Sequence, residues 1–219
     1  MATTRLDRAK VAGTALDLLN ETGLEGLTLR AIAQRLDVKA PALYWHFKDK
    51  QALLDEMATE MMRRMNAEFP AVPDPDWRVA LTRSMSGLRD HLLRYRDGAK
   101  VYSGTHFTDL SYAAPMEAHL RVLDEAGFAP DAAARAWVTA YSYTIGYVIE
   151  EQAAGPGPAG GEGGYDLAAR AERLAAYPLA AAAGEVVFRG RDHGFAAGLA
   201  ALVAGIGVTL SASAAPGGA

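Results

Sequence analysis

A short run of aromatic and basic side chains offers the clearest chemistry in this sequence. Residues 44–46 read Tyr-Trp-His, and Lys48 and Lys50 follow directly. A protein core can bury only part of so dense a cluster, so the rest must face solvent. Hydroxyl, imidazole and ammonium groups bind phosphate oxygens, and the small side chains of Ala40 and Ala42 would let a helix come close to the major groove. The pattern therefore predicts contact with DNA.

Two short helices joined by a tight turn are expected to carry these groups. The first begins after Thr28 as its N-cap, and it has four apolar residues at the spacing of one buried face: Leu29, Ile32, Ala33 and Leu36. The turn falls at residues 37–39. Pro41 fits the first turn of the second helix, where its missing N–H has no partner in any case, and that helix should end near Phe47.

The candidate DNA contacts fall into two kinds. Tyr44, His46 and Lys50 suit phosphates, whereas Lys39 and Ala42 are better placed for base edges. The predicted DNA-binding residues are Thr28, Arg30, Lys39, Ala40, Pro41, Ala42, Tyr44, Trp45, His46 and Lys50. The alternative is a helical hairpin in which four neighbouring residues are all core: Leu43, Tyr44, Trp45 and Phe47.

Periodicity extends the helical pattern over the rest of the chain. A first helix over residues 6–21 should stop at Gly23, and a linking helix over 51–69 precedes a proline cluster. Further helices are expected at 77–95, 116–126, 130–150, 167–177 and 193–210, with residues 96–98 and 184–190 as interruptions. The Gly-, Pro- and Ala-rich stretch 153–164 should be a mobile loop. With no strand pattern, the predicted fold class is all-α.

The final helix has a distinct composition. Small residues recur at helical spacings, which favours close packing against the helix before the loop: Gly194, Ala197, Gly198, Ala201, Ala204 and Gly205. We interpret this apolar tract as a packing helix and not as a membrane span, since no uninterrupted run of roughly 18 apolar residues occurs in the sequence. The expected partners therefore do not include a membrane.

Charge and cysteine content limit the function classes. The 219 residues include no cysteine, which excludes disulfides and thiolate zinc sites and suits a cytoplasmic location. The net charge is −4, but residues 1–50 carry +2 and the remainder −6. This distribution favours binding of nucleic acid by residues 1–50, the head of the protein, and by no other part. It argues against a non-specific architectural DNA protein.

An enzyme is the hypothesis from a different class. It would use His106, His119 or His193 beside a carboxylate such as Glu150. The sequence has no H-E-x-x-H, G-x-S-x-G or phosphate-loop motif, and these histidines lie on separate expected elements. We therefore predict no catalytic residues and no cofactor.

The head carries a long motif. Residues 28–50 match T-x-R-x-[IL]-A-x-x-L-x-V-x-x-x-x-L-Y-x-H-F-x-x-K at every specified position, which resembles the DNA-binding domain of the TetR family of transcriptional regulators. RDGAKVYSGT at 96–105 and GYVIEEQ at 146–152 are similar to the tetracycline-repressor branch. The resemblance implies a ligand-responsive repressor that binds palindromic double-stranded operator DNA as a homodimer and is released by a small-molecule effector. Residues 1–50 would be a three-helix helix-turn-helix DNA-binding domain, and 51–219 a helical ligand-binding and dimerisation domain.

One departure from that branch bears on the effector. In the branch the inducer enters as a magnesium chelate, held by a histidine in the first of these motifs and, through water, by a glutamate. Glu150 keeps the glutamate, but Tyr102 takes the histidine's place, and a phenol is a poor Mg²⁺ ligand. We therefore expect an aromatic effector and no metal. The alternative keeps the metal chelate, with His106 or His119 acting beside Glu150.

Other positions that resemble the branch's drug contacts have also changed. These are Asn66, Ser84, Leu88 and His119, whereas Thr105 is retained. Several aromatic residues would suit a flat hydrophobic ligand, although any single one is more often part of the core or the dimer interface. The predicted ligand-binding residues are Asn66, Ser84, Leu88, Tyr102, Thr105, Tyr112, His119, Trp137, Tyr141, Tyr147 and Glu150.

Overall fold

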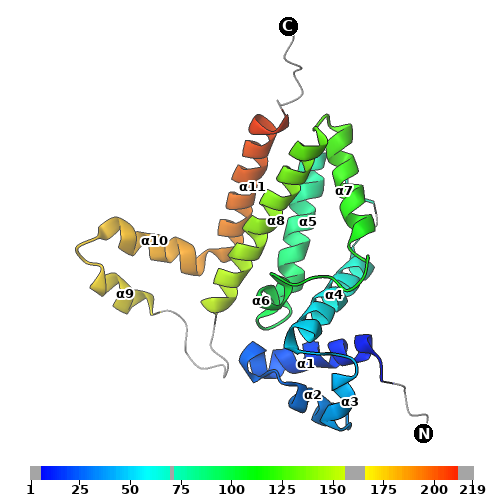
Figure 1. Ribbon diagram of the computed structural model, residues 1–219. Coiled ribbons are helices and arrows are strands. Elements are labelled where there is room, and N and C mark those ends of the chain that lie inside the picture. The colour runs from blue at the N-terminus through cyan, green and yellow to red at the C-terminus, as the bar shows by residue number, and fades with distance from the viewer. Residues whose placement is uncertain (1–5, 70–71, 156–165, 212–219) are drawn as a thin grey trace. The chain divides into compact units, whose positions relative to one another are not determined.

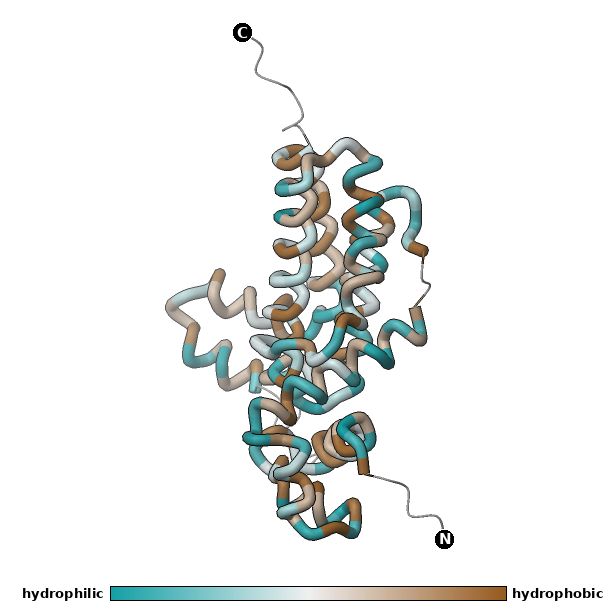
Figure 2. Tube along the Cα trace, turned by 45° about the vertical axis from the view of Figure 1, so that its right-hand side comes forward, coloured by the Kyte–Doolittle hydropathy of each residue, from teal (hydrophilic) through white to brown (hydrophobic). Residues whose placement is uncertain are grey.

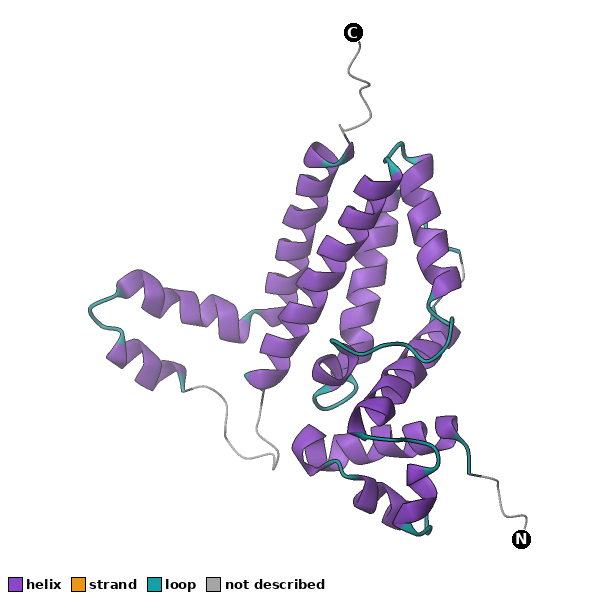
Figure 3. Cartoon of the chain, viewed as in Figure 1, coloured by secondary structure: helices purple, strands orange, loops and turns teal. Residues whose placement is uncertain are grey.

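The computed structural model describes residues 6–69, 72–155 and 166–211. Among these residues every regular element is a helix and none is a strand (Figures 1 and 3), which confirms the all-α class. Contacts divide the chain into two compact units. The first unit is Met1–Pro73 with Asp90–Ala118, and the second is Asp74–Arg89 with His119–Ala219. The boundary falls inside α5 (Trp77–Leu93) and inside α7 (Ala113–Glu125).

The first unit holds the predicted head. It contains α1 (Arg8–Gly26), α2 (Leu29–Arg35), α3 (Ala40–Tyr44), α4 (Lys50–Glu68) and α6 (Gly98–Tyr102). The helix α1 packs on α4 and on α2, and α4 packs on α6 (Figure 1). The apolar side chains between them are fully buried, among them Val11, Leu16, Leu19, Ile32, Leu43, Phe47, Leu53 and Met57. Burial of this area is what holds the short helices α2 and α3 in place, because isolated helices of this length are unstable in water.

The second unit is organised on two long helices, α8 (Pro130–Ala153) and α11 (Arg191–Thr209), which pack on each other (Figure 2 marks their apolar residues). Tyr143 stacks on Phe195, with ring centroids 5.6 Å apart. A Cβ atom on Gly198 would collide with the Tyr143 hydroxyl, so glycine permits this approach. The predicted pairing of the final helix with the helix before the loop is confirmed. By length and composition alone α11 could also cross a membrane, so hydropathy does not separate the two interpretations.

One expected interruption is confirmed and the other is a helix instead. Residues 94–97 form a turn that separates α5 from α6, with Asp97 in the left-handed region (φ 56°), and only Gly98 of the predicted interruption 96–98 is helical. Residues 184–190 were predicted as a connection, yet most of them lie in α10 (Pro178–Arg189), because Pro178 is compatible with the first position of a helix and starts a new one. The predicted helix 167–177 is correspondingly shorter, and α9 ends at Arg173.

Several helix ends differ from the expected positions by a few residues. The helix α1 continues to Gly26, although Gly23 has non-helical backbone angles, so the predicted stop is a kink. The recognition helix α3 ends at Tyr44 and not near Phe47, and α7 includes Pro115 in its first turn. The helix α8 continues to Ala153, and most of the predicted loop 153–164 lies outside the described residues.

Candidate functional site

The helix-turn-helix in the first unit is set by local hydrogen bonds. The Thr28 hydroxyl accepts from the Ala31 N–H at 3.1 Å, which caps α2 as predicted. Asp37 adopts a φ of 53°, in the left-handed region where Asp and Asn are the commonest residues after glycine. The Val38 N–H donates to the Ala33 carbonyl at 3.0 Å, so the chain reverses before α3. This turn positions the aromatic run at the end of α3.

The four residues of the hairpin alternative separate cleanly by exposure. Leu43 and Phe47 are fully buried, whereas Tyr44 is 58% exposed and Trp45 is 90% exposed. The hypothesis that all four are core is therefore wrong. A tryptophan side chain left in water gives up a large hydrophobic stabilisation, so its exposure indicates a surface that meets a partner.

The other predicted DNA-binding residues gather in the same short stretch of the first unit. Seven of the ten predicted residues are exposed: Thr28, Arg30, Lys39, Pro41, Tyr44, Trp45 and Lys50. Ala40, Ala42 and His46 are half-buried. The Lys50 ammonium donates to the Leu24 carbonyl at 3.3 Å, which holds the start of α4 beside the end of α1. Their contact with DNA remains a prediction.

Arg8 is a residue of this site that sequence reasoning missed. Its guanidinium donates to the His46 carbonyl at 2.6 Å and to the Glu56 carboxylate at 2.8 Å, and it lies over the Phe47 ring at 4.7 Å. These contacts fix the end of the recognition helix to α4. No local pattern marks them, because the partners lie 38 and 48 positions away in the sequence.

Four predicted ligand-binding residues lie in the first unit. Tyr102 is buried, and its ring packs edge-on against Phe107 with centroids 5.5 Å apart. Tyr112 stacks on the same Phe107, with centroids 5.4 Å apart. Thr105 donates its hydroxyl to the Tyr102 carbonyl at 2.9 Å, and the Asn66 amide donates to the Ser111 carbonyl at 2.7 Å. Packing thus joins Tyr102 and Tyr112 through Phe107, which was not predicted.

Tyr102 does not fit a magnesium site. Its hydroxyl is directed at the thioether sulfur of Met62, at 3.9 Å, and Mg²⁺ requires oxygen ligands in near-octahedral geometry. Within the described ranges no three His, Asp or Glu side chains come together as a metal-binding group.

Three further candidates form a cluster in the second unit. The Ser84 hydroxyl and the His119 imidazole are hydrogen-bonded, and the His119 ring lies 4.8 Å from the Trp137 ring. With Trp77 and Leu123, His119 and Trp137 line a crevice too narrow for a water-sized molecule. The cluster combines hydrogen-bonding groups with an aromatic surface, which are the features of an effector-binding wall.

The remaining candidates of the second unit lie in other surroundings. Leu88 is buried, and burial raises the pKa of the Tyr141 phenol. Tyr147 donates its hydroxyl to the Arg191 carbonyl at 2.8 Å and packs on Phe195, so its visible contacts belong to the pairing of α8 with α11. Glu150, the predicted ligand carboxylate, is exposed.

The neighbouring Glu151 is the carboxylate that holds a buried cation. Arg89 donates to both Glu151 oxygens, at 2.9 and 2.7 Å, and to Asp192 at 2.6 Å. The side chains of Arg89 and Glu151 are 8% and 11% exposed. The hydrogen bonds that Arg89 donates to Glu151 and Asp192 raise the pKa of Arg89 despite its burial. This ion-pair cluster joins α5, α8 and α11 of the second unit, and the sequence did not reveal it.

A helix-turn-helix with an exposed aromatic and basic recognition segment, joined to a helical body, defines a DNA-binding regulator. Two family models match the chain: "Bacterial regulatory proteins, tetR family" over residues 13–57, and "Tetracyclin repressor-like, C-terminal domain" over residues 69–210. Together they span both the head and the body.

Individual relatives agree with these models. The tetracycline repressor protein class A from transposon 1721 of Escherichia coli is 41% identical over 204 residues, which is 93% of this chain and 91% of that protein. A possible TetR family regulator of Streptomyces coelicolor A3(2) is 40% identical, with a TM-score of 0.78 over 92% of this chain and 99% of that one. A class A TetR in complex with 5a,6-anhydrotetracycline and magnesium is 37% identical, with a TM-score of 0.64 over 91% and 96%.

The chain belongs to the TetR family. Proteins of this family are transcriptional regulators and not enzymes, and they act as dimers on operator DNA under the control of small-molecule effectors. This chain is accordingly a ligand-responsive transcriptional repressor.

Proposed function

We propose that this repressor is released from its operator by an aromatic small molecule whose binding needs no Mg²⁺. The observation that carries the proposal is the environment of Tyr102: a buried phenol directed at a sulfur atom and packed against Phe107. A phenol in such surroundings offers a hydrogen bond and an aromatic face, and it offers no charge for a divalent cation.

The residues that support an aromatic effector share two properties. In the first unit Tyr102, Thr105 and Tyr112 provide ring faces and neutral hydrogen-bonding groups. His119 and Trp137 provide the same kinds of group in the second unit, considered by itself. A flat polycyclic ligand with a few hydroxyl or carbonyl groups matches that chemistry. The ligand acts as an inducer when it binds the DNA-free conformation more tightly than the DNA-bound one.

The test has two stages. Thermal stabilisation against a panel of aromatic natural products, with and without Mg²⁺, identifies ligands without knowledge of the operator, because a bound ligand raises apparent stability by mass action. Release from operator DNA is then titrated with each hit in EDTA and in excess Mg²⁺. We expect equal release in both. Release that occurs only with Mg²⁺ contradicts the proposal.

A metal-chelate inducer is the second candidate, and the 41% identity to a class A tetracycline repressor favours it. Its carboxylate would be Glu150, which is exposed. Minocycline is the direct probe: stabilisation by minocycline that requires Mg²⁺ supports this candidate, and stabilisation without the metal supports the metal-free one.

On the DNA side we propose that the ten residues predicted from Thr28 to Lys50 contact the operator. Lys50→Ala should weaken binding to all sequences alike and reduce the slope of log K against log salt by about one, because one phosphate contact is lost. Lys100→Ala is the matched control, since Lys100 is an exposed lysine of the same unit on α6 that pairs with Asp97. An unchanged slope for Lys50→Ala would remove this residue from the interface.

The dimer brings two recognition helices about one DNA turn apart, roughly 34 Å, so that each reads one half of a palindrome. We propose that α8 and α11 supply its interface, a four-helix core. Gly205 supports this assignment: within the chain a Cβ there meets nothing within 4 Å, so its side is open to a partner helix. Light scattering that gives only a monomer at micromolar concentration contradicts the dimer.

We also propose that the protein works in the cytoplasm, because its partner is operator DNA.

A further inference from the structure

The segment between α6 and α7, residues 103–112, is held on one side by aromatic packing. Phe107 lies edge-on to Tyr102 and stacks on Tyr112. Tyr102 and Tyr112 are both candidate effector-binding residues. A ligand that binds at either ring meets Phe107 as a neighbour, because Phe107 contacts both of them.

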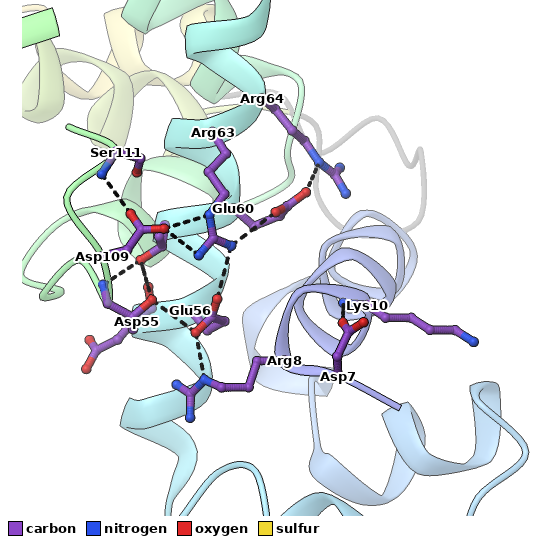
Figure 4. Close-up of polar contacts among 12 residues, drawn as sticks. Asp7, Arg8, Lys10, Asp55, Glu56, Glu60, Arg63, Arg64, Asp109 and Ser111 are labelled. Carbon is purple, nitrogen blue, oxygen red and sulfur yellow. Dashed lines mark hydrogen bonds and ion pairs between the residues drawn. The ribbon is translucent and has the colours of Figure 1, made fainter. Parts of the chain in front are cut away.

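The residues directly after Phe107 are bound to α4 by polar contacts. Asp109 accepts two hydrogen bonds from Arg63, at 2.9 and 2.7 Å, and one from the Ser111 N–H at 2.8 Å (Figure 4). The Thr108 N–H donates to the Thr59 hydroxyl at 2.8 Å. The hydrogen bonds from Ser111, followed by that from Arg63, lower the pKa of Asp109 to about 2. A movement of Phe107 would therefore act on Thr108 and Asp109, the next two residues, which are hydrogen-bonded to α4.

Glu56 on α4 is the centre of these contacts. Its side chain is 4% exposed, and its two oxygens accept from Arg63 at 3.1 Å, Thr108 at 3.0 Å and Arg8 at 2.8 Å (Figure 4 shows the two arginines). Burial alone would raise the pKa of Glu56, but the hydrogen bonds from Arg8, Thr108 and Arg63 outweigh it and leave the pKa lowered. A buried carboxylate depends strongly on its partners, since losing one leaves charge uncompensated.

Arg8 carries the connection to the DNA-binding end. Besides Glu56, it binds the His46 carbonyl and covers the Phe47 ring. The His46 and Phe47 amides both donate to the Leu43 carbonyl at 2.9 Å, which closes the last turn of the recognition helix. The Arg8 guanidinium therefore connects the buried Glu56 carboxylate to His46 and Phe47, the two residues that follow the exposed Trp45.

We propose that the ionic chain Asp109–Arg63–Glu56–Arg8 couples the position of segment 103–112 to the order of the recognition helix. It is continuous, lies within one compact unit, and begins beside the aromatic residues to which an effector would bind. Its use as the route of induction rests on the proposed effector site. The coupling itself is a property of the first unit alone, and it exists whether or not that site is correct.

The test removes one charge from the ionic chain at Asp109, the end farthest from the recognition helix. Amide exchange in that helix is then measured without DNA or effector. Asp109→Asn keeps the shape of the side chain and removes its charge. Amide hydrogen exchange by NMR on the full chain should show the His46 and Phe47 amides exchanging roughly 3- to 30-fold faster, the range expected for local coupling, while the α11 amides keep their rates. Thr108→Val, which removes a different contact to Glu56, should accelerate the same two amides.

Glu68→Gln is the control. Glu68 also lies on α4 and pairs with Arg94 at 2.6 Å. Within the described part of the protein it forms no hydrogen bond or ion pair with the four residues of the ionic chain. It should leave His46 and Phe47 unchanged. The proposal is overturned if Asp109→Asn accelerates exchange only within 103–112, or if Glu68→Gln accelerates the two amides equally, since the effect would then be a general loosening of α4. Failure to find an effector would refute the proposed inducer site and leave this result intact.

Discussion

The buried pair of Arg89 and Glu151 yields the sharpest stability prediction. Glu151→Gln keeps the size of the side chain and removes the charge that faces the guanidinium. Both side chains are nearly excluded from water, and the two hydrogen bonds between them are 2.9 and 2.7 Å long. The guanidinium also lies 5.1 Å from the Phe195 ring, so it cannot turn to solvent without disturbing the pairing of α8 with α11.

The expected loss of stability in Glu151→Gln depends on the partner that Arg89 keeps in this variant. Breaking a buried ion pair costs about 3–5 kcal/mol when the surviving charge has no other partner. Here Asp192 still accepts from Arg89 at 2.6 Å, but its side chain is 92% exposed and compensates only in part. We therefore expect Glu151→Gln to lower the free energy of unfolding by about 2–3 kcal/mol. In a chain of this size that corresponds to a fall in Tm of roughly 5–10 °C.

Urea denaturation at a fixed protein concentration measures this change, because dimerisation makes apparent stability depend on concentration. Asp131→Asn on α8 is the matched control, since it removes an exposed pair with Arg135 and should leave the midpoint in place. The double variant Arg89→Met with Glu151→Met should recover most of the loss, as apolar replacements of buried pairs often do. A midpoint for Glu151→Gln equal to the wild type would refute the reasoning.

Three further predictions concern single contacts. The pKa of Asp109 is lowered to about 2. Its contribution to the free energy of unfolding is therefore complete above the unfolded pKa near 3.9 and is lost as the pH falls towards 2. Urea unfolding should show that Asp109→Asn flattens the decline in stability between about pH 4 and pH 2. Gly198→Ala places a methyl group against the Tyr143 hydroxyl and should destabilise the protein by about 1–3 kcal/mol in thermal melts, whereas Gly205→Ala should alter only dimerisation in light scattering. Thr28→Ala removes the cap of α2 and should cost about 1 kcal/mol, while Thr28→Ser should retain most of it; equal losses would show that the hydroxyl is not the cause.

Local rules were sufficient for the head of the molecule. The Thr28 cap, the turn at 37–39 and the proline near the start of α3 each depend on residues within five positions of one another. The residue types also indicated that part of the aromatic run faces solvent: Tyr44 and Trp45, which were assigned to DNA contact, are exposed, whereas Phe47 is buried. A shorter α3 than expected did not affect that result.

The effector-binding candidates show where local reasoning stops. Residue types indicated an aromatic, metal-free effector, but they did not indicate that Tyr147 also joins α8 to α11. Glu150 remains a predicted ligand-binding residue, and the sequence did not indicate that the adjacent Glu151 holds a buried cation. One residue of helix changes the direction of a side chain by about 100°, and only the packed partner decides which of two neighbours is buried.

By itself the sequence determined the all-α class, the helix-turn-helix and the family, because these depend on hydrophobic period, capping and a motif read over contiguous residues. Tertiary structure alone decided the ionic contacts. Arg8 meets Glu56 across 48 positions, Arg63 meets Asp109 across 46, and Arg89 meets Asp192 across 103. Such pairs have no sequence spacing of their own, since their distance is set by how amphipathic helices pack and by the need of each buried charge for a partner.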